Sequence, residues 1–166
     1  MKTNFVLMIL LVAVFSCCTN PGKPLSGTDK YLMKTDVKQI VNTIIKGCEE
    51  AKFETAMAPF LDSPDLRYIV NGSVFTYKDV VSEMKPIFDL LSNQKVTLFT
   101  EEFSFPDNST VLYTSASRWE MNYKDGHSTI AEPMAWFLLF KKIDNKWKVI
   151  YGVESYFEKN VEAKTN

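Results

Sequence analysis

Histidine and cysteine are scarce in this sequence of 166 residues, and each shortage excludes a class of site. His127 is the only histidine, so a His-rich metal site is excluded and any Ser-His-Asp triad would need this residue. Beyond a cysteine pair near the N-terminus only Cys48 remains, and a single thiol can neither form an internal disulfide nor provide metal-ligand spacing. We therefore expect no metal and no cofactor.

Positive charge is also limited. The formal net charge is −1, and Arg67 and Arg118 are the only arginines. Without a basic field there is nothing to attract a phosphate backbone, so we expect no nucleic-acid partner. About 150 residues follow the N-terminal apolar segment, which is enough for one domain with its own core.

The N-terminus has the features of an export signal. Lys2 is followed by an unbroken apolar run, Phe5 to Phe15, which as a helix would cover about half of a ~30 Å hydrocarbon core. Such a run is too short to span a membrane and has the length of a signal peptide. The run ends in Val14-Phe15-Ser16-Cys17, which resembles the bacterial lipobox that ends in an acylated cysteine.

We therefore predict a signal peptide over residues 1–17, with lipid attachment at Cys17 and the protein exported and anchored to a membrane of a bacterial cell envelope. Several acyl chains on one cysteine anchor a protein stably, because each buried CH₂ contributes ~0.8 kcal/mol. Two alternatives stay open: Cys18 as the acceptor, and an ordinary cleaved signal with unmodified cysteines.

Composition divides the remaining chain into a flexible tether over residues 18–35, a globular domain over 36–158 and a polar tail over 159–166. Apolar spacing, caps and turn residues predict the elements of the domain. We expect helices over 36–51, 53–60 and 76–91, the last kinked or split at Pro86. A short hairpin turning at Asn71-Gly72 should join strands 66–70 and 73–75, and four long strands should cover 96–105, 111–123, 129–141 and 147–157.

Two stretches resemble the nuclear transport factor 2-like superfamily, which includes SnoaL-like cyclases and ketosteroid isomerase. The first runs from Phe60-Leu61-Asp62 through Asn71-Gly72 to the segment that begins at Thr76. The second runs from Phe140 through Trp147 to Ser155. The resemblance implies an α+β, cone-shaped fold in which N-terminal helices pack on a strongly bent antiparallel sheet around a pocket. It also implies a homodimer through the outer sheet face, but no single activity.

The resemblance also suggests which residues line the pocket. It places the positions of Tyr151 and Val153 inward on the last strand, and Asp62 near the mouth. Tyr68 and Phe75 come from the first hairpin, where the alternation of Leu66, Tyr68 and Val70 must meet the helices. The family often has histidines at positions 151 and 153, so a histidine-based mechanism is disfavoured here.

Arg118 and Glu120 complete the candidate set. If Asp125-Gly126 is a two-residue turn, Ala116 faces Ala135, and Arg118 and Glu120 point inward with them. The opposite side would then hold Trp119 and Trp136 among other large apolar side chains, as core or dimer face. A one-residue slip would exchange the faces, and a solvated Arg118–Glu120 pair at the sheet rim is the alternative.

Two functions remain open. The first, which we favour from the sequence, is a lipid-anchored binding or accessory domain that holds a small apolar ligand and has no chemistry. The second is an isomerase or dehydratase with Asp62 or Glu120 as base and Tyr68 or Tyr151 as donor. A carboxylate inside an enclosed apolar pocket, within hydrogen-bond reach of a tyrosine, would reverse that order.

Overall fold

The computed structural model describes residues 24–161 of the chain. The predicted signal peptide, Cys17, residues 18–23 of the expected tether and residues 162–166 of the tail lie outside the described residues. Along the chain the elements are α2 (Gly27–Glu49), α3 (Phe53–Met57), β1 (Arg67–Val70), β2 (Ser73–Phe75), α4 (Tyr77–Leu90), β3 (Leu91–Asp107), β4 (Thr110–Tyr123), β5 (Ser128–Ile143) and β6 (Lys146–Val161). Among the described residues, no helix is long and apolar enough to cross a membrane.

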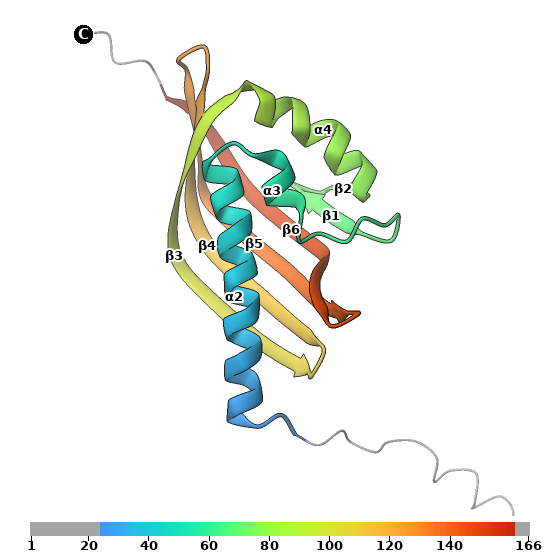
Figure 1. The fold of residues 1–166 in the computed structure, drawn as a ribbon. Helices are drawn as coiled ribbons and strands as arrows, with labels where there is room; N and C mark the ends of the chain where they lie inside the picture. The colour runs from blue at the N-terminus through green and yellow to red at the C-terminus, as the bar shows by residue number, and fades with distance from the viewer. Residues whose placement is uncertain (1–23, 162–166) are drawn as a thin grey trace, which may run out of the picture.

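The strands form one six-stranded sheet in the order β2-β1-β6-β5-β4-β3. The sheet is strongly curved, and the helices lie on its inner side (Figure 1). The predicted α+β fold with helices on a bent sheet is confirmed. The sheet differs from the expected antiparallel one at a single place, because β1 pairs with β6 in parallel. This pairing brings the first hairpin next to the last strand.

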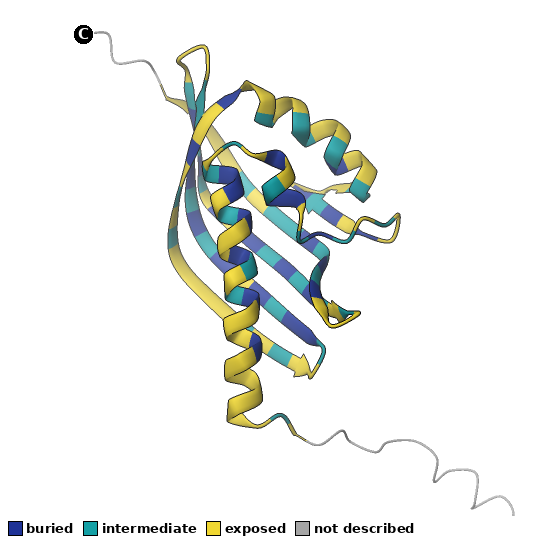
Figure 2. Ribbon diagram, viewed as in Figure 1, coloured by how far each residue is buried: buried dark blue, intermediate teal, exposed yellow. Residues whose placement is uncertain are grey.

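The core lies between α2 and the inner face of the sheet (Figure 2). Val37, Val41, Ile44 and Cys48 of α2 are buried at the predicted helical spacing. On the sheet, Tyr113, Leu138 and Phe140 are fully buried opposite them. Gly47 is where α2 meets α3: a Cβ at this position would lie 2.4 Å from the backbone nitrogen of Ala56.

The start of α2 corrects the expected boundary of the tether. The helix begins at Gly27 rather than at residue 36, because Ser26 and Asp29 form a capping box. The side chain of Ser26 accepts from the backbone N–H of Asp29, and the carboxylate of Asp29 accepts from the N–H of Ser26. The same arrangement, formed by Thr76 and Asp79, starts α4 as predicted. α4 then continues through Pro86 without the expected split.

The hairpin between β4 and β5 corrects the predicted register. The backbone N–H of Tyr123 donates to the carbonyl of His127, so three residues form the turn rather than two. Glu120 therefore pairs with Ile130, whereas an irregularity after Ser117 restores the predicted pairing of Ala116 with Ala135. The shift is taken up in β5, where the buried positions change from Thr129 and Ala131 to Met134 and Trp136, whereas the alternation along β4 is unbroken.

Candidate active site

A cavity of about 180 Å³ lies between the three helices and the inner face of the sheet. Most of its wall is apolar. Four methionines line it, namely Met57, Met84, Met121 and Met134, together with rings that include Phe53, Phe60, Phe88, Trp119 and Trp136. Its polar or ionisable lining residues are Cys48, Tyr68, Gln94, Tyr123, Tyr156, Glu154 and Glu158. Among the described residues, no Lys, Arg or His lines it.

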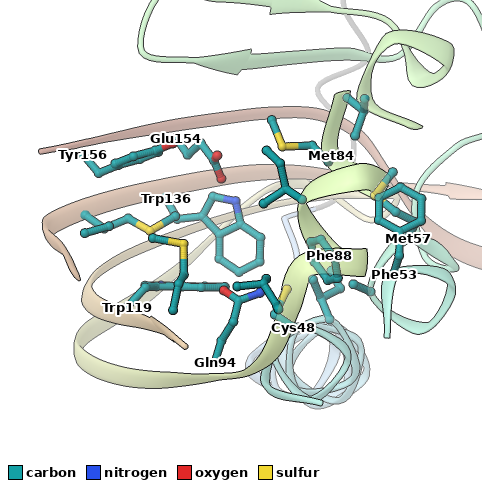
Figure 3. Close-up of a pocket in the computed structure, with 18 of the residues that line it drawn as sticks. Cys48, Phe53, Met57, Met84, Phe88, Gln94, Trp119, Trp136, Glu154 and Tyr156 are labelled. Atoms are coloured by element: carbon teal, nitrogen blue, oxygen red, sulfur yellow. The ribbon is translucent and has the colours of Figure 1, made fainter. Parts of the chain in front are cut away.

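A bulge in β6 directs Glu154 into this cavity. Tyr151 pairs with Leu139 and Val149 pairs with Phe140, which leaves Ile150 as an extra residue. Beyond the extra residue the alternation continues one step out of phase, so Glu154 and Tyr156 line the cavity. Figure 3 shows both side chains entering it from the same strand.

A chain of hydrogen bonds holds the carboxylate of Glu154. Its Oε2 accepts a hydrogen bond of 2.8 Å from the hydroxyl of Tyr68. That hydroxyl in turn accepts a bond of 2.9 Å from the indole N–H of Trp136. Within residues 24–161 no hydrogen bond reaches the other oxygen, Oε1. One oxygen is therefore held in place while the other is available to a ligand.

Tyr68 reaches Glu154 because a glycine lies beneath its ring. A Cβ at Gly152 would lie 2.3 Å from Cε2 of Tyr68. The parallel pairing of β1 with β6 sets Tyr68 opposite Gly152. Phe60 packs edge-on against the ring of Tyr68 from the other side, with 5.8 Å between the ring centroids. The indole of Trp136 is fixed in the same manner by edge contacts with Tyr113 and Trp119.

The environment of Glu154 brings its titration into the physiological range. Burial raises the pKa of Glu154 from 4.5 to about 7, against the opposing effect of the Tyr68 hydrogen bond. At neutral pH the carboxyl is thus roughly half ionised, the condition that suits a general base. Burial, together with the charge of Glu154, raises the pKa of Tyr68 well above its ordinary value. Burial and nearby carboxylates also raise the pKa of the Cys48 thiol, which makes it a poor nucleophile.

The structure brings few of the sequence-predicted residues to this cavity. Tyr68 lies on its wall, as the alternation of β1 indicated. Tyr151 and Val153 do not line it, because the bulge at Ile150 turns them to the opposite face of β6. Asp62 is exposed outside the cavity, and Phe75 packs against the core without lining it.

Arg118 and Glu120 lie on the outer face of the sheet. Arg118 is 3.5 Å from the carboxylate of Glu120 and 3.7 Å from that of Glu132, and all three side chains are partly exposed. Ala116 and Ala135 pair as predicted but lie on this outer face too, so the prediction was wrong about which face of β4 points inward, and Trp119 and Met121 take the inward positions instead. Arg118 and Glu120 therefore form a solvated ion pair, the alternative given above, and do not form a polar end of the pocket.

Sequence reasoning missed Glu154, Trp136 and Gln94 as site residues. Glu154 had one signal, a carboxylate that directly follows the uncharged stretch from Val149 to Val153. Its partner Tyr68 is 86 residues away along the chain, and no local pattern connects them. Among the described residues, no group of three or more His, Cys, Asp or Glu could hold a metal ion.

No protein-family model and no curated protein matches this sequence. Solved structures do match. A putative scytalone dehydratase from Novosphingobium aromaticivorans matches with a TM-score of 0.72 at 10% identity, over 84% of this chain and 94% of that one. The hexachlorocyclohexane dehydrochlorinase LinA-type3 from Novosphingobium barchaimii gives 0.66 at 10% identity, over 83% and 96%.

A nuclear transport factor 2-like protein of unknown function from Shewanella oneidensis gives a TM-score of 0.58 at 18% identity, over 74% of this chain and 98% of that one. At these identities the likeness extends to the fold and no further. The chain therefore has the nuclear transport factor 2-like fold.

Proposed function

We propose that this protein is an enzyme of the isomerase or dehydratase kind, in which Glu154 removes a proton from carbon of a small, mainly apolar substrate. The observation that carries the proposal is the carboxylate of Glu154 in an apolar cavity, hydrogen-bonded at 2.8 Å to the hydroxyl of Tyr68. A base of this kind needs a pKa near the working pH and a free oxygen facing the substrate. Glu154 supplies both.

The chemistry begins with one proton transfer. Oε1 of Glu154 takes a proton from a substrate C–H, and the electron pair of that bond stays on the substrate. In an elimination the pair forms a double bond as a leaving group departs from the neighbouring carbon. In an isomerisation it is shared with an adjacent carbonyl, and protonated Glu154 returns the proton at another carbon. Two proteins of similar structure, a putative scytalone dehydratase and a hexachlorocyclohexane dehydrochlorinase, support a reaction of this class.

Tyr68 and Trp136 act as positioning residues in this proposal. The N–H of Trp136 holds the Tyr68 hydroxyl, and that hydroxyl holds Oε2 of the carboxylate. The same bond stabilises the ionised form, which limits the rise in pKa that burial causes. Without it, less of the base would be ionised at neutral pH.

Cyclohex-3-enone is a suitable probe, because moving its double bond into conjugation needs one proton removed and one returned. The new conjugated enone is followed by ultraviolet absorbance. We expect the wild-type rate to rise with pH around a midpoint near 7. Glu154→Gln should isomerise the probe about 10²–10⁴-fold more slowly than wild type, because a general base usually contributes a factor of this size to the rate. Glu102→Gln, at an exposed position of β3 that does not line the cavity, is the matched control and should keep the rate. Equal rates for wild type and Glu154→Gln would exclude Glu154 as the base.

The second candidate is the binding or accessory domain that the sequence favoured. The hydrogen bonds of Tyr68 support it. The Tyr68 hydroxyl accepts from Trp136 and donates to Glu154, so this hydroxyl cannot donate to a substrate while Glu154 is ionised. Wild-type protein that binds cyclohexenone without isomerising it would favour this function.

Export and lipid attachment at Cys17 are part of the proposal. Their support is the apolar run that ends in Val14-Phe15-Ser16-Cys17. Cells expressing wild type and Cys17→Ser are labelled with a clickable fatty acid and then fractionated. The Cys17→Ser variant should lose both the label and membrane association, with Cys18→Ser as the matched control. Unchanged labelling of Cys17→Ser would contradict anchoring at this residue.

We also propose a homodimer through the outer face of the sheet. Phe99 on β3 is 54% exposed, and the outward-facing Phe137 and Leu139 on β5 are only partly buried. Apolar side chains on an outer face favour coverage by a second copy. Light scattering on a chain without the signal peptide should give the mass of a dimer, and a monomer at high micromolar concentration would contradict it.

A further inference from the structure

Gln94 is a second polar group built into the cavity wall. It lies on β3 and pairs with Met121 of β4. An irregularity of β3 between Leu91 and Asn93 brings it to the inner face, where its side chain lines the cavity. Only 8% of Gln94 is exposed. Figure 3 shows its amide group pointing toward the cavity beside Trp119 and Cys48.

The side-chain amide of Gln94 makes no hydrogen bond to another residue of 24–161, and its polar atoms are not among the fully enclosed ones, so the amide opens onto the cavity. An amide without a protein partner that faces a cavity can bond to water there or to a ligand that replaces the water. Leucine or methionine would fill the same volume and continue the apolar wall, but neither could bind a polar ligand atom. An unpaired amide at this position therefore indicates a ligand that supplies the missing partner.

The size and charge of the cavity define that ligand. A cavity of about 150 Å³ is enough to hold a benzene molecule, and this one measures about 180 Å³. It therefore fits one six-membered ring with a short substituent. Glu154 and Glu158 are its two carboxylates, and no basic side chain lines it within the described part of the chain. These carboxylates repel an anionic ligand, and the mainly apolar wall favours a neutral ligand because a charged one would lose its bonds to water.

We infer that Gln94 recognises the oxygen of a neutral, single-ring carbonyl compound, whose acidic C–H it presents to Glu154. The amide N–H of Gln94 donates to the carbonyl oxygen. When Glu154 takes the proton, negative charge develops on that oxygen, and the same N–H stabilises it. This inference rests on the proposed role of Glu154 and adds the substrate class and the residue that recognises it.

Gln94 and Glu154 line the same cavity, so one ligand in it can face both groups. Gln94 and Glu154 lie on β3 and β6, with β4 and β5 between them. The strand pairings set Gln94 level with Asn160 of β6, six residues beyond Glu154, and the curvature of the sheet turns both side chains into the same cavity. In Figure 3 the indole of Trp136 lies between the two polar groups, as a flat surface on which a ring can rest.

Binding is measured separately from turnover, with unreactive probes. The four cavity methionines serve as reporters: in protein labelled with ¹³C at the methionine methyls, Met57, Met84, Met121 and Met134 should shift when the cavity fills. Cyclohexanone is the ketone probe, and methylenecyclohexane is the same shape without the oxygen. Cyclohexylammonium and cyclohexanecarboxylate test the two charges. The proteins are wild type, Gln94→Leu, Gln94→Met and, as the matched control, Gln39→Leu on the exposed side of α2.

Wild type should bind cyclohexanone, and both Gln94 variants should bind it about two- to tenfold more weakly, the effect of one neutral hydrogen bond. Methylenecyclohexane should bind the Gln94 variants at least as tightly as it binds wild type. Gln39→Leu should bind every probe with the affinity of wild type. The inference fails if the Gln94 variants bind cyclohexanone as tightly as wild type, or if cyclohexylammonium is the preferred probe. Glu154→Gln should still bind cyclohexanone, so failure of the Gln94 inference and failure of the proposed base give different results.

Discussion

Replacing Glu154 by glutamine should stabilise the protein, and the gain should depend on pH. The carboxyl has a pKa of about 7 in the folded protein, against an ordinary value of 4.5. Because the folded state holds its proton more tightly, the stability of wild type falls as pH rises from 4.5 to about 7. Glutamine has the same shape and nothing to titrate, so the variant does not show this loss.

The magnitude follows from the two pKa values. A difference of 7 − 4.5 = 2.5 units corresponds to about 3 kcal/mol at 1.36 kcal/mol per unit. This figure is an upper limit, because the carboxylate faces a cavity that can admit water. The free energy of unfolding should therefore be nearly equal for the two proteins at pH 4.5. At pH 8 it should be higher for Glu154→Gln by up to about 3 kcal/mol.

Urea unfolding, followed by tryptophan fluorescence at several pH values and constant ionic strength, measures the difference directly. Carboxylates whose pKa is lowered, such as Asp79 and Asp107, affect both proteins alike and cancel. Glu158→Gln is the matched control, because an exposed carboxylate should give no gain that grows with pH. The reasoning is refuted if the difference between Glu154→Gln and wild type is the same at pH 4.5 and pH 8.

Two further substitutions test the support of the carboxylate. Tyr68→Phe leaves the N–H of Trp136 without its acceptor and should lower the free energy of unfolding by about 1–3 kcal/mol in urea titrations. Tyr151→Phe, outside the cavity, is its control, and an equal effect of the two would show that the hydroxyl of Tyr68 has no special role. Gly152→Ala puts a methyl group 2.3 Å from the ring of Tyr68 and should cost about 1–3 kcal/mol in thermal unfolding. Gly27→Ala, with open space around its Cβ, should cost far less, and similar costs at both glycines would contradict the close approach.

Local signals in the sequence predicted most of the fold. The Asn71-Gly72 turn is present, with both residues at positive φ, and Thr76 caps the following helix with Asp79. Ser26 and Asp29 carry the same capping pattern as Thr76 and Asp79, yet the surrounding Pro, Gly and Thr residues favoured a tether. Each of these features depends on residues within three or four positions of one another.

The candidate site depended on features that sequence patterns do not carry. The extra residue Ile150 and the three-residue turn before His127 each shift a strand by one position. The shift at Ile150 exchanges the two faces of β6, which is why Tyr151 was expected inside and Glu154 was not considered. Glu120 was expected inside because Ala116 and Ala135 were assigned to the inner face, whereas both lie on the outer one. Tyr68 was placed correctly because β1 has no such bulge.

The pKa of Glu154 is the most direct test of the central claim, that the cavity holds a carboxylate adapted to accept protons near neutral pH. A ¹³C NMR titration of glutamate side-chain carboxyls gives this value, with the Glu154 signal assigned by its absence in Glu154→Gln. We predict a midpoint close to 7, shifted further upward in Tyr68→Phe, which lacks the hydrogen bond that lowers the pKa. A midpoint near 4.5 in wild type would contradict the account, because the carboxylate would then be solvated rather than enclosed.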